Sequence, residues 1–303
     1  MSYPELFLQF TKDNSEVEYL PAHNLSTYST FKTKTFCDLI IVKSIKALQE
    51  LVLLANKFNL KYKLLGWGAN QVLREMNGFY LKLDFPFDRE TLTVYQDKYT
   101  IPASASLANL TSAASKLKLK QWEVFTGIPS SFGGALFMNA GTSLGEIGSL
   151  LESFEYVDKQ GKLIKHTVNN QTFSYRKNNI VKEGEVIVSG VIKTFGQDEG
   201  IPQLISNYLK MRNSSQPMSK NTCGCVFKNY SYQDGTKISA GQLLDLLNLK
   251  GFGVKGIRIS PIHANFFEHD GTLSDWEVIS FLEKVKSIVQ LYTGIELEFE
   301  VQI

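Results

Sequence analysis

The sequence contains little cysteine and no recognisable pattern of metal ligands. Its 303 residues include only three cysteines, Cys37, Cys223 and Cys225, and four histidines without H-x-x-x-H spacing. An odd cysteine count does not make a disulfide framework, and a Cys-x-Cys pair is not a four-ligand zinc site. We therefore expect no metal and a reducing compartment.

Charge imbalance and long apolar runs are also lacking. Lys and Arg number 32 against 30 Asp and Glu, a formal net charge of +2, and no basic block indicates a nucleic-acid surface. No segment reaches the roughly 18 apolar residues of a membrane span. The N-terminus lacks the basic region and apolar core of a signal peptide. These absences predict a soluble cytoplasmic protein that acts on small molecules.

A run of glycines and small residues, Gly127–Gly141, is the most unusual stretch that is present. It has too many small residues for a packed helix and too many apolar ones for a disordered linker. Glycine lets main chain approach a ligand closely, and consecutive N–H groups form anion sites. The run predicts a phosphate-bearing cofactor, with a glycine-rich turn pair between two strands as the alternative.

The N-terminal third reads as a βαβ unit. Residues 37–42 predict a buried strand, and Ser44 caps a helix that ends near Asn59. A strand at 62–65 runs into the loop Gly66-Trp67-Gly68-Ala69-Asn70, and another strand follows at 79–83. The loop lacks the third glycine and the following helix of the dinucleotide fingerprint, which excludes an ordinary Rossmann domain.

The rest of the chain has clear local signals. We expect a strand at 92–94 that forms a hairpin with 99–103, a helix from Leu107 to Leu117, and strands at 154–158, 162–164 and 186–188. A polar tract begins near residue 200. Beyond it we expect a helix from Ala240 that ends at Gly251, a capping box at Ser274–Glu277 that opens a helix ending at Gly294, and a closing strand at 297–303.

Six motifs occur in a fixed order: the loop at 66–70, the run at 127–141, Tyr175-Arg176, Gly224-Cys225-Val226-Phe227-Lys228-Asn229, the segment from Gly241 to Phe266, and Leu297-x-x-Glu300-Val301. In this order they make the chain resemble the UDP-N-acetylenolpyruvoylglucosamine reductases, flavoenzymes of bacterial cell-wall precursor synthesis. The chain resembles the shorter subfamily, which lacks a tyrosine-bearing loop over the substrate.

The resemblance implies an α+β fold: a two-domain FAD-binding cradle of the vanillyl-alcohol-oxidase type plus a C-terminal α+β substrate-binding domain. With 43% hydrophobic residues the chain supports several cores. We place the two FAD-binding subdomains at 1–88 and 89–199 and the substrate-binding domain at 200–303, with the last strand returning to the active site. FAD is expected to lie extended between the first two.

The implied activity is an NADP-dependent oxidoreductase reaction of peptidoglycan synthesis. NADPH reduces the flavin, which passes hydride to C3 of the enolpyruvyl ether of UDP-N-acetylglucosamine, and C2 is then protonated to give UDP-N-acetylmuramate. The resemblance implies FAD as cofactor, NADPH as co-substrate, and a monomeric bacterial enzyme of the cytoplasm that needs neither nucleic acid nor membrane.

The resemblance assigns three catalytic residues. Arg176 lies beside the substrate carboxylate, where a planar, permanently charged donor favours the transition state. Cys225 replaces the serine of many members as proton donor to C2, since a thiol loses its proton more readily than an alkanol. Glu300 stabilises the enol or helps to deliver the proton, and Glu298 competes with it because both point the same way in a strand.

The resemblance also assigns binding residues. Those for the cofactor are Gly66, Trp67, Gly68, Ala69, Asn70, Gly127, Ile128, Pro129, Ser130, Ser131, Gly133, Gly134, Asn139, Ala140 and Gly141. Those for the substrate are Tyr175, Arg212, Lys228 and Asn229.

The chain departs from the family pattern at several cofactor positions. Ala69 replaces a serine, Lys34-Thr35 replaces a glycine pair, and Ser130 replaces a frequent glycine. Two alternatives follow: another FAD oxidoreductase of the same superfamily, or a non-catalytic protein that binds flavin or sugar nucleotide. A module that binds no flavin at all would show no flavin spectrum.

Overall fold

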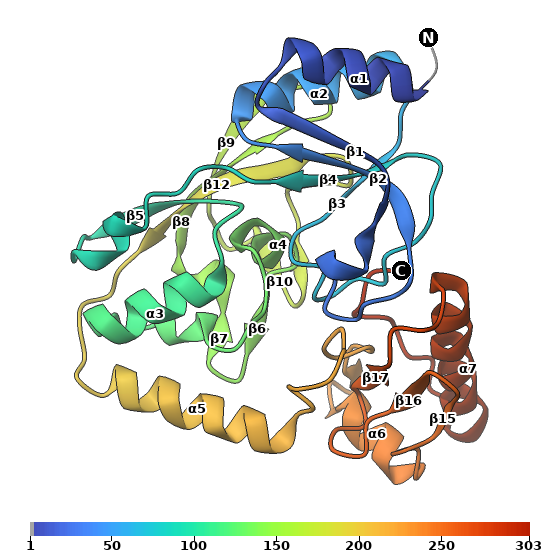
Figure 1. Ribbon diagram of the computed structural model, residues 1–303. Coiled ribbons are helices and arrows are strands. Elements are labelled where there is room, and N and C mark those ends of the chain that lie inside the picture. The colour runs from blue at the N-terminus through green and yellow to red at the C-terminus, as the bar shows by residue number, and fades with distance from the viewer. Residues whose placement is uncertain (1–2) are drawn as a thin grey trace. The chain divides into compact units, whose positions relative to one another are not determined.

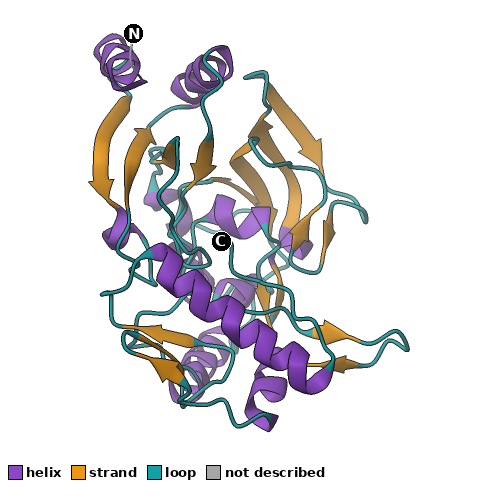
Figure 2. Cartoon of the chain, turned by 90° about the vertical axis from the view of Figure 1, so that its right-hand side faces the viewer, coloured by secondary structure: helices purple, strands orange, loops and turns teal. Residues whose placement is uncertain are grey.

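The computed structural model describes residues 3–303. The chain divides into two compact units, which we call the first and second unit. The first contains the described residues up to Ala22, then Asp38–Gly66 and Asn77–Leu209; the second contains His23–Cys37, Trp67–Met76 and Lys210–Ile303. The described residues form both helices and strands (Figure 2). The three-domain division at residues 88 and 199 stays a prediction.

The N-terminal βαβ unit is confirmed. A four-stranded sheet has the order β1-β2-β4-β3, in which β2 and β3 both run parallel to β4. Its strands are β1 (Val17–Asn24), β2 (Phe36–Val42), β3 (Tyr62–Leu64) and β4 (Phe79–Leu83). Helices α1 (Tyr3–Asp13) and α2 (Ile45–Lys57) share a core with one face of this sheet (Figure 1). Ser44 caps α2 as expected, accepting from Ala47 N at 3.2 Å.

A second, antiparallel sheet of the first unit has the order β5-β12-β8-β9. Its strands are β5 (Lys98–Pro102), β8 (Leu151–Val157), β9 (Leu163–Thr167) and β12 (Val186–Lys193), and helix α3 (Leu107–Leu117) packs with it into one core. The expected strand and hairpin at 92–94 are wrong. Asp88 caps a short 3-10 helix, η2 (Arg89–Thr93), by accepting from Glu90 N at 2.9 Å, and this local cap overrides the short β-branched run.

The small-residue run contains a buried helix, α4 (Phe132–Phe137), so the prediction that it holds no packed helix is wrong. Its glycines permit close packing instead of preventing it. A Cβ on Gly133 would lie 2.6 Å from Ala103 Cβ, and one on Gly190 would lie 3.0 Å from the Phe132 ring. Small residues therefore let α4 lie directly against the sheet.

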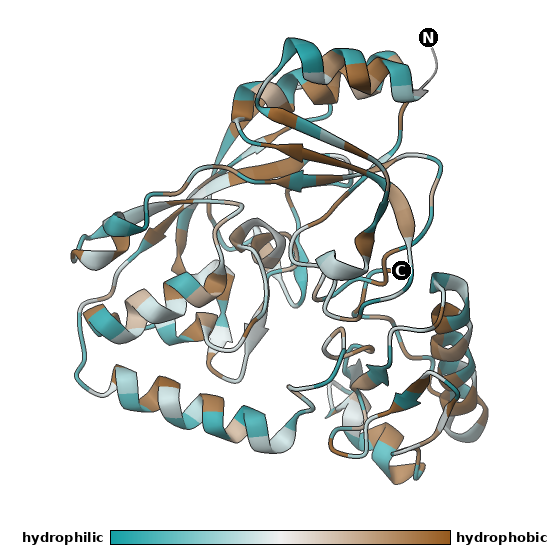
Figure 3. Ribbon diagram, in the orientation of Figure 1, coloured by the Kyte–Doolittle hydropathy of each residue, from teal (hydrophilic) through white to brown (hydrophobic). Residues whose placement is uncertain are grey.

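The second unit packs two helices with a three-stranded antiparallel sheet, β15 (Gly253–Val254), β16 (Ile257–Ile259) and β17 (Phe267–His269). The capping box of α7 (Asp275–Thr293) is confirmed, and Gly294 ends the helix with φ 71°. The buried residues of α7, Val278, Phe281, Leu282, Val285 and Val289, recur at helical spacing, and hydrophobic and hydrophilic bands follow one another along the helices in Figure 3. Helix α6 (Ala240–Leu246) ends before the expected Gly251, because Asn248 takes a left-handed conformation with φ 55°.

The closing strand expected at 297–303 is wrong. The segment instead makes isolated bridges, Phe227 with Phe299 and Gln71 with Gln302. Its partners are single residues of irregular segments. The apolar residues of 297–303 are therefore buried or half-buried without a continuous ladder of strand hydrogen bonds. The polar tract after residue 200 forms helix α5 (Ile201–Ser215). Within residues 3–303, no helix is both long and apolar enough to cross a membrane.

The remaining elements are short. They are η1 (Leu25–Tyr28), η3 (Trp122–Phe125), β6 (Gly141–Thr142), β7 (Gly145–Glu146), η4 (Ile147–Leu150), β10 (Phe173–Ser174), β11 (Lys177–Asn178), β13 (Tyr230–Ser231) and β14 (Lys237–Ile238).

Candidate active site

Two of the predicted cofactor segments meet inside the first unit. A Cβ on Gly66, just beyond β3, would lie 2.8 Å from Ser131 Oγ. Ser131 caps α4, because its hydroxyl accepts from Gly134 N at 3.3 Å. The sequence predicted both segments separately, and the fold brings them together at this point.

Lys82 is a residue near this point that the sequence reading missed. Its Nζ donates to the carbonyl oxygen of Gly66 at 3.3 Å. Burial lowers its pKa below the ordinary lysine value, while nearby Asp84 opposes that shift. The available signal was a lysine inside the otherwise apolar strand β4.

The rest of the first cofactor loop belongs to the second unit. Gly68 has φ +57°, and a Cβ there would lie 2.3 Å from the carbonyl oxygen of Tyr28. The Gly68 carbonyl accepts from Thr30 N at 3.3 Å and from the Ser29 hydroxyl at 3.2 Å. Glycine is therefore required at this position by both conformation and space.

The loops fit a phosphate-bearing cofactor such as FAD. Gly127 is half-buried and takes a left-handed conformation with φ 73°, which glycine adopts without strain, whereas Gly68 is buried and the space for its Cβ is filled by protein atoms. Gly134 is exposed on the first turn of α4, whereas Gly133 and Gly141 are filled by protein atoms and serve packing. Accessible main chain with such glycines is the usual setting for a diphosphate.

Asn139 holds the hairpin that carries Arg176. Asn139 is 1% exposed and has φ 44°. Its Nδ2 donates to Glu146 Oε2 at 2.8 Å and to the carbonyl oxygen of Ser174, in β10, at 3.1 Å. Its Oδ1 accepts from Gly148 N at 3.0 Å. The structure thus uses the side chain of this predicted cofactor residue to fix the β10–β11 hairpin.

Arg176 lies in the turn between β10 and β11. It has φ 56°, and its guanidinium carbon is 5.2 Å from the centre of the Tyr175 ring. The Tyr175 side chain is exposed. A charged, half-buried guanidinium presented on a fixed turn is suited to bind a carboxylate.

Cys225 and Glu300 are joined through the main chain in the second unit. Glu300 N donates to the carbonyl oxygen of Val226, the residue after Cys225, at 2.8 Å. Cys225 is half-buried, whereas Cys223 is fully buried and burial raises the pKa of its thiol to about 12. Of these two thiols, Cys225 is the one that a substrate can reach.

Asn70 ties the first cofactor loop to this segment. Its Nδ2 donates to the carbonyl oxygen of Glu300 at 2.9 Å, and its own carbonyl accepts from Gln302 N at 3.0 Å. A residue predicted for the cofactor and a residue predicted for catalysis are therefore direct neighbours.

The two candidate glutamates differ in their surroundings. Glu298 is exposed and pairs with Lys228 Nζ at 2.9 Å, and this hydrogen bond lowers the pKa of Glu298. Glu300 is half-buried and held on both sides by main-chain hydrogen bonds to Val226 and Asn70. The difference supports Glu300 over Glu298.

The other predicted substrate residues have protein partners. Arg212 donates through Nε and a terminal nitrogen to Gln216 Oε1, at 2.9 and 2.7 Å. Asn229 Oδ1 accepts from Ala240 N at 3.1 Å, at the start of α6. Lys228 is paired with Glu298, as described above, so each of these groups is positioned at the surface of the second unit.

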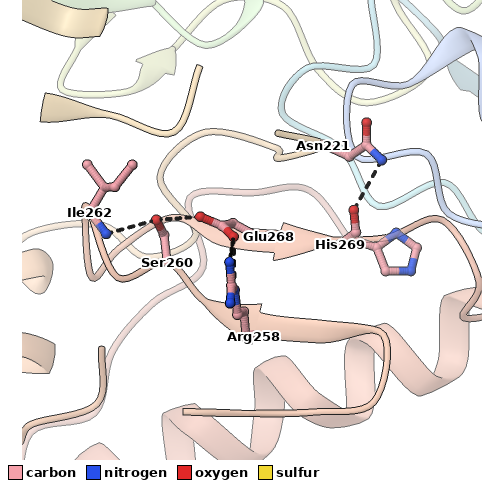
Figure 4. A network of polar contacts seen from close by, with 6 residues as sticks. All are labelled: Asn221, Arg258, Ser260, Ile262, Glu268 and His269. Atoms are coloured by element: carbon pink, nitrogen blue, oxygen red, sulfur yellow. Dashed lines mark hydrogen bonds and ion pairs between the residues drawn. The ribbon is translucent and has the colours of Figure 1, made fainter. Parts of the chain in front are cut away.

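A polar network fixes the sheet of the second unit (Figure 4). Glu268, 8% exposed, accepts from Arg258 at 2.9 and 2.7 Å and from the Ser260 hydroxyl at 2.8 Å. Ser260 Oγ also accepts from Ile262 N at 3.2 Å. The buried carboxylate is therefore fully engaged, and it orders the turn that leads to the His263-Ala264-Asn265-Phe266 segment.

Comparison with known proteins gives the class first. Residues 39–167 match a family described as an FAD binding domain. Together with the glycine-bearing loops, this match defines an FAD-containing flavoprotein, and the expected α+β class with an FAD-binding portion is confirmed.

The particular family follows from three findings. Residues 216–303 match the C-terminal domain of UDP-N-acetylenolpyruvoylglucosamine reductase. Reductases of that name from Streptococcus pneumoniae (strain JJA) and Halalkalibacterium halodurans are 34% and 29% identical over 289 and 284 residues, which is 92% of this chain and 91% and 92% of theirs. The crystal structure of the Thermus caldophilus reductase superposes with a TM-score of 0.75 at 25% identity, covering 94% of this chain and 98% of that one. The chain belongs to the UDP-N-acetylenolpyruvoylglucosamine reductase family, and it is an oxidoreductase.

Proposed function

We propose that this protein reduces the enolpyruvyl ether of UDP-N-acetylglucosamine to UDP-N-acetylmuramate, with NADPH as the source of electrons. The main observation in support is that Glu300 is bonded to the peptide that follows Cys225. A thiol and a carboxyl on adjoining segments suit a reaction that must protonate one carbon and stabilise charge beside it.

The reaction adds one hydride and one proton across a carbon–carbon double bond. FAD held by this protein would supply the hydride for C3, with NADPH as the source of its electrons. The electron pair of the double bond then becomes negative charge at C2, where a proton must arrive. Cys225 Sγ donates that proton, because an unperturbed thiol has a pKa of about 8.5, far below that of an alkanol. The thiolate regains its proton from water.

Arg176 and Glu300 act on the charge that develops beside C2. Arg176 binds the substrate carboxylate, which gains enolate character as the double bond is reduced, through its planar guanidinium. Glu300 stabilises the enol or helps to deliver the proton to C2. Both groups are preorganised, Arg176 on a turn held by Asn139 and Glu300 by Val226 and Asn70.

The cofactor and substrate contacts follow the same assignment. Main chain of the 66–70 loop and of 127–134 would hold the FAD diphosphate, since Gly127 is half-buried with φ 73° and Gly134 is exposed on the first turn of α4. Arg212 and Lys228 would offer cations to the diphosphate of the sugar nucleotide, exchanging Gln216 and the exposed Glu298 for phosphate oxygens. Asn229 and Tyr175 would contact the sugar nucleotide from neighbouring positions.

A visible spectrum of the purified protein tests the proposal. Flavin bands at about 370 and 450 nm should bleach with NADPH and return when the enolpyruvyl substrate is added without oxygen. Bands that bleach but do not return would move the function to another FAD oxidoreductase. Bands that do not bleach would indicate a non-catalytic flavin-binding protein, and a protein that takes up no added FAD would contradict the flavin site itself.

We further propose a monomeric cytoplasmic enzyme with three domains, bounded near residues 88 and 199, that needs neither nucleic acid nor membrane. The nearly balanced charge, +2, supports the absence of a nucleic-acid partner. Light scattering after size exclusion tests the oligomeric state: a mass near 34.1 kDa is expected, and twice that mass would contradict it.

A further inference from the structure

Asn265 holds the two peptide groups that follow Cys225. Phe227 N donates to Asn265 Oδ1 at 3.0 Å, and Asn265 Nδ2 donates back to the carbonyl oxygen of Phe227 at 2.8 Å. The Asn265 carbonyl accepts from Val226 N at 2.9 Å. Three hydrogen bonds from one residue, itself 2% exposed, therefore fix the chain directly beyond the thiol.

The same clamped segment receives Glu300. The Val226 carbonyl accepts from Glu300 N at 2.8 Å and from Val301 N at 3.3 Å. Because Asn265 fixes the N–H of Val226 and both polar groups of Phe227, a shift of Asn265 would move the attachment point of Glu300 together with Cys225. One residue, through its side chain and its main-chain carbonyl, thus controls the place of two proposed catalytic groups.

Asn265 is itself firmly placed. Its N–H donates to His263 Nδ1 at 3.2 Å, and burial lowers the pKa of His263, which favours the neutral ring that can accept this bond. Cys225 forms an isolated antiparallel bridge with Phe266, the next residue. The turn before it is ordered by the Glu268 network shown in Figure 4.

We propose that Asn265 is a positioning residue that sets the Cys225 thiol and the Glu300 carboxyl for the protonation step. The proposal rests on the proposed function for the role of these two groups. The clamp needs one acceptor and one donor in a fixed order on the same planar group, which an amide provides. Alanine removes both groups, and serine keeps a single hydroxyl.

The test uses the flavin-loaded protein with Asn265→Ala and Asn265→Ser. The first readout is independent of activity: the rate at which iodoacetamide alkylates Cys225, followed by peptide mass spectrometry, with the buried Cys37 and Cys223 as internal references. The second readout separates flavin reduction by NADPH from flavin reoxidation by substrate in a stopped-flow instrument. Val285→Ala, a core truncation in α7 of the same unit, is the control for lost stability alone.

We expect Asn265→Ala to alter Cys225 alkylation and to slow reoxidation by about 100-fold, as misplacement of a reacting group by about 1 Å does. Flavin reduction should be unchanged, and Asn265→Ser should lie between wild type and Asn265→Ala. If the rates of Cys225 alkylation and of flavin reoxidation in Asn265→Ala both equal those of Val285→Ala, the proposal is overturned. Altered alkylation with unchanged reoxidation would uphold the clamp and refute Cys225 as proton donor. If Asn265→Ala does not fold, the milder Asn265→Ser decides by the same criteria.

Discussion

The main-chain N–H of Glu300 donates to the carbonyl oxygen of Val226 at 2.8 Å. This bond joins the last residues of the chain to the segment that carries Cys225, and the same Val226 carbonyl also accepts from Val301 N. The relationship places a carboxyl and a thiol on adjoining segments of one compact unit. Several measurable consequences depend on it.

Replacing Cys225 should block protonation selectively. Cys225→Ala is expected to slow flavin reoxidation by substrate by about 10²–10⁴-fold, the usual contribution of a general acid. Flavin reduction by NADPH should be retained, because it does not use this proton. Cys223→Ala is the matched control, since Cys223 is buried and burial raises the pKa of its thiol. Equal reoxidation by Cys225→Ala and wild type would refute the donor assignment.

The two C-terminal glutamates should behave differently. Glu300→Gln is expected to lower the rate of reoxidation, because it removes the charge and the exchangeable proton from the residue bonded to Val226. Glu298→Gln only weakens an exposed ion pair with Lys228 and should change the rate little. Steady-state kinetics of both variants decide the matter, and a larger loss in Glu298→Gln would reverse the assignment.

Removing the Asn139 amide should loosen the hairpin of Arg176. Asn139→Ala leaves the Gly148 N–H and the Ser174 carbonyl without their partner, a cost of about 1–3 kcal/mol for a buried group. We expect a lower melting temperature and a raised KM for the enolpyruvyl substrate. Asn179→Ala, an exposed amide on the same hairpin, should have a smaller effect. Identical KM values for the two variants would argue against this role of Asn139.

The contact between Gly66 and Ser131 predicts a rescue experiment. Gly66→Ala places a Cβ 2.8 Å from Ser131 Oγ and should reduce the flavin retained on purification. The measurement is the ratio of flavin absorbance, at about 450 nm, to protein absorbance. Ser131→Ala in the same chain removes the clash and should restore retention.

Gly68→Ala is the contrasting variant. Gly68 has φ +57°, and a Cβ there would lie 2.3 Å from the main-chain oxygen of Tyr28. Ser131→Ala should therefore not restore flavin retention in this variant. Rescue of both variants, or of neither, would mean that the Ser131 contact does not limit flavin binding.

His263 predicts the direction of a pH dependence. Burial lowers the pKa of His263 in the folded protein, whereas unfolded histidine titrates near about 6.5. Below that pH the unfolded chain binds a proton that the folded chain does not, so the free energy of unfolding falls as the pH falls from about 7 to 5.5. His263→Asn keeps an acceptor for Asn265 N and should lose less stability over this range. Urea titrations at each pH give the comparison, and parallel curves would contradict the prediction.

The sequence by itself determined the local structure and the family. The capping box of α7, the N-cap of α2, the 3.6-residue periodicity of both helices, and the glycines at left-handed positions are local signals, because they depend on residues a few positions apart. The ordered motifs identified the reductase family, which the relatives confirm. Local signals predicted the wrong structure where contacts with residues far along the chain decide which element forms. Residues 297–303 alternate like a strand, but their partners allow only isolated bridges.

Only the tertiary structure decided how the motifs are connected. No spacing in the sequence indicates that the amide of Asn139 reaches Ser174, that Asn70 reaches Glu300, or that Asn265 brackets Phe227. The physical reason is that buried polar groups must find hydrogen-bond partners, and the fold supplies them from distant segments: Asn70 and Glu300 are 230 residues apart. The packing of α4 is also decided by tertiary structure. Gly133 is required there because Ala103 lies against it and leaves no room for a Cβ.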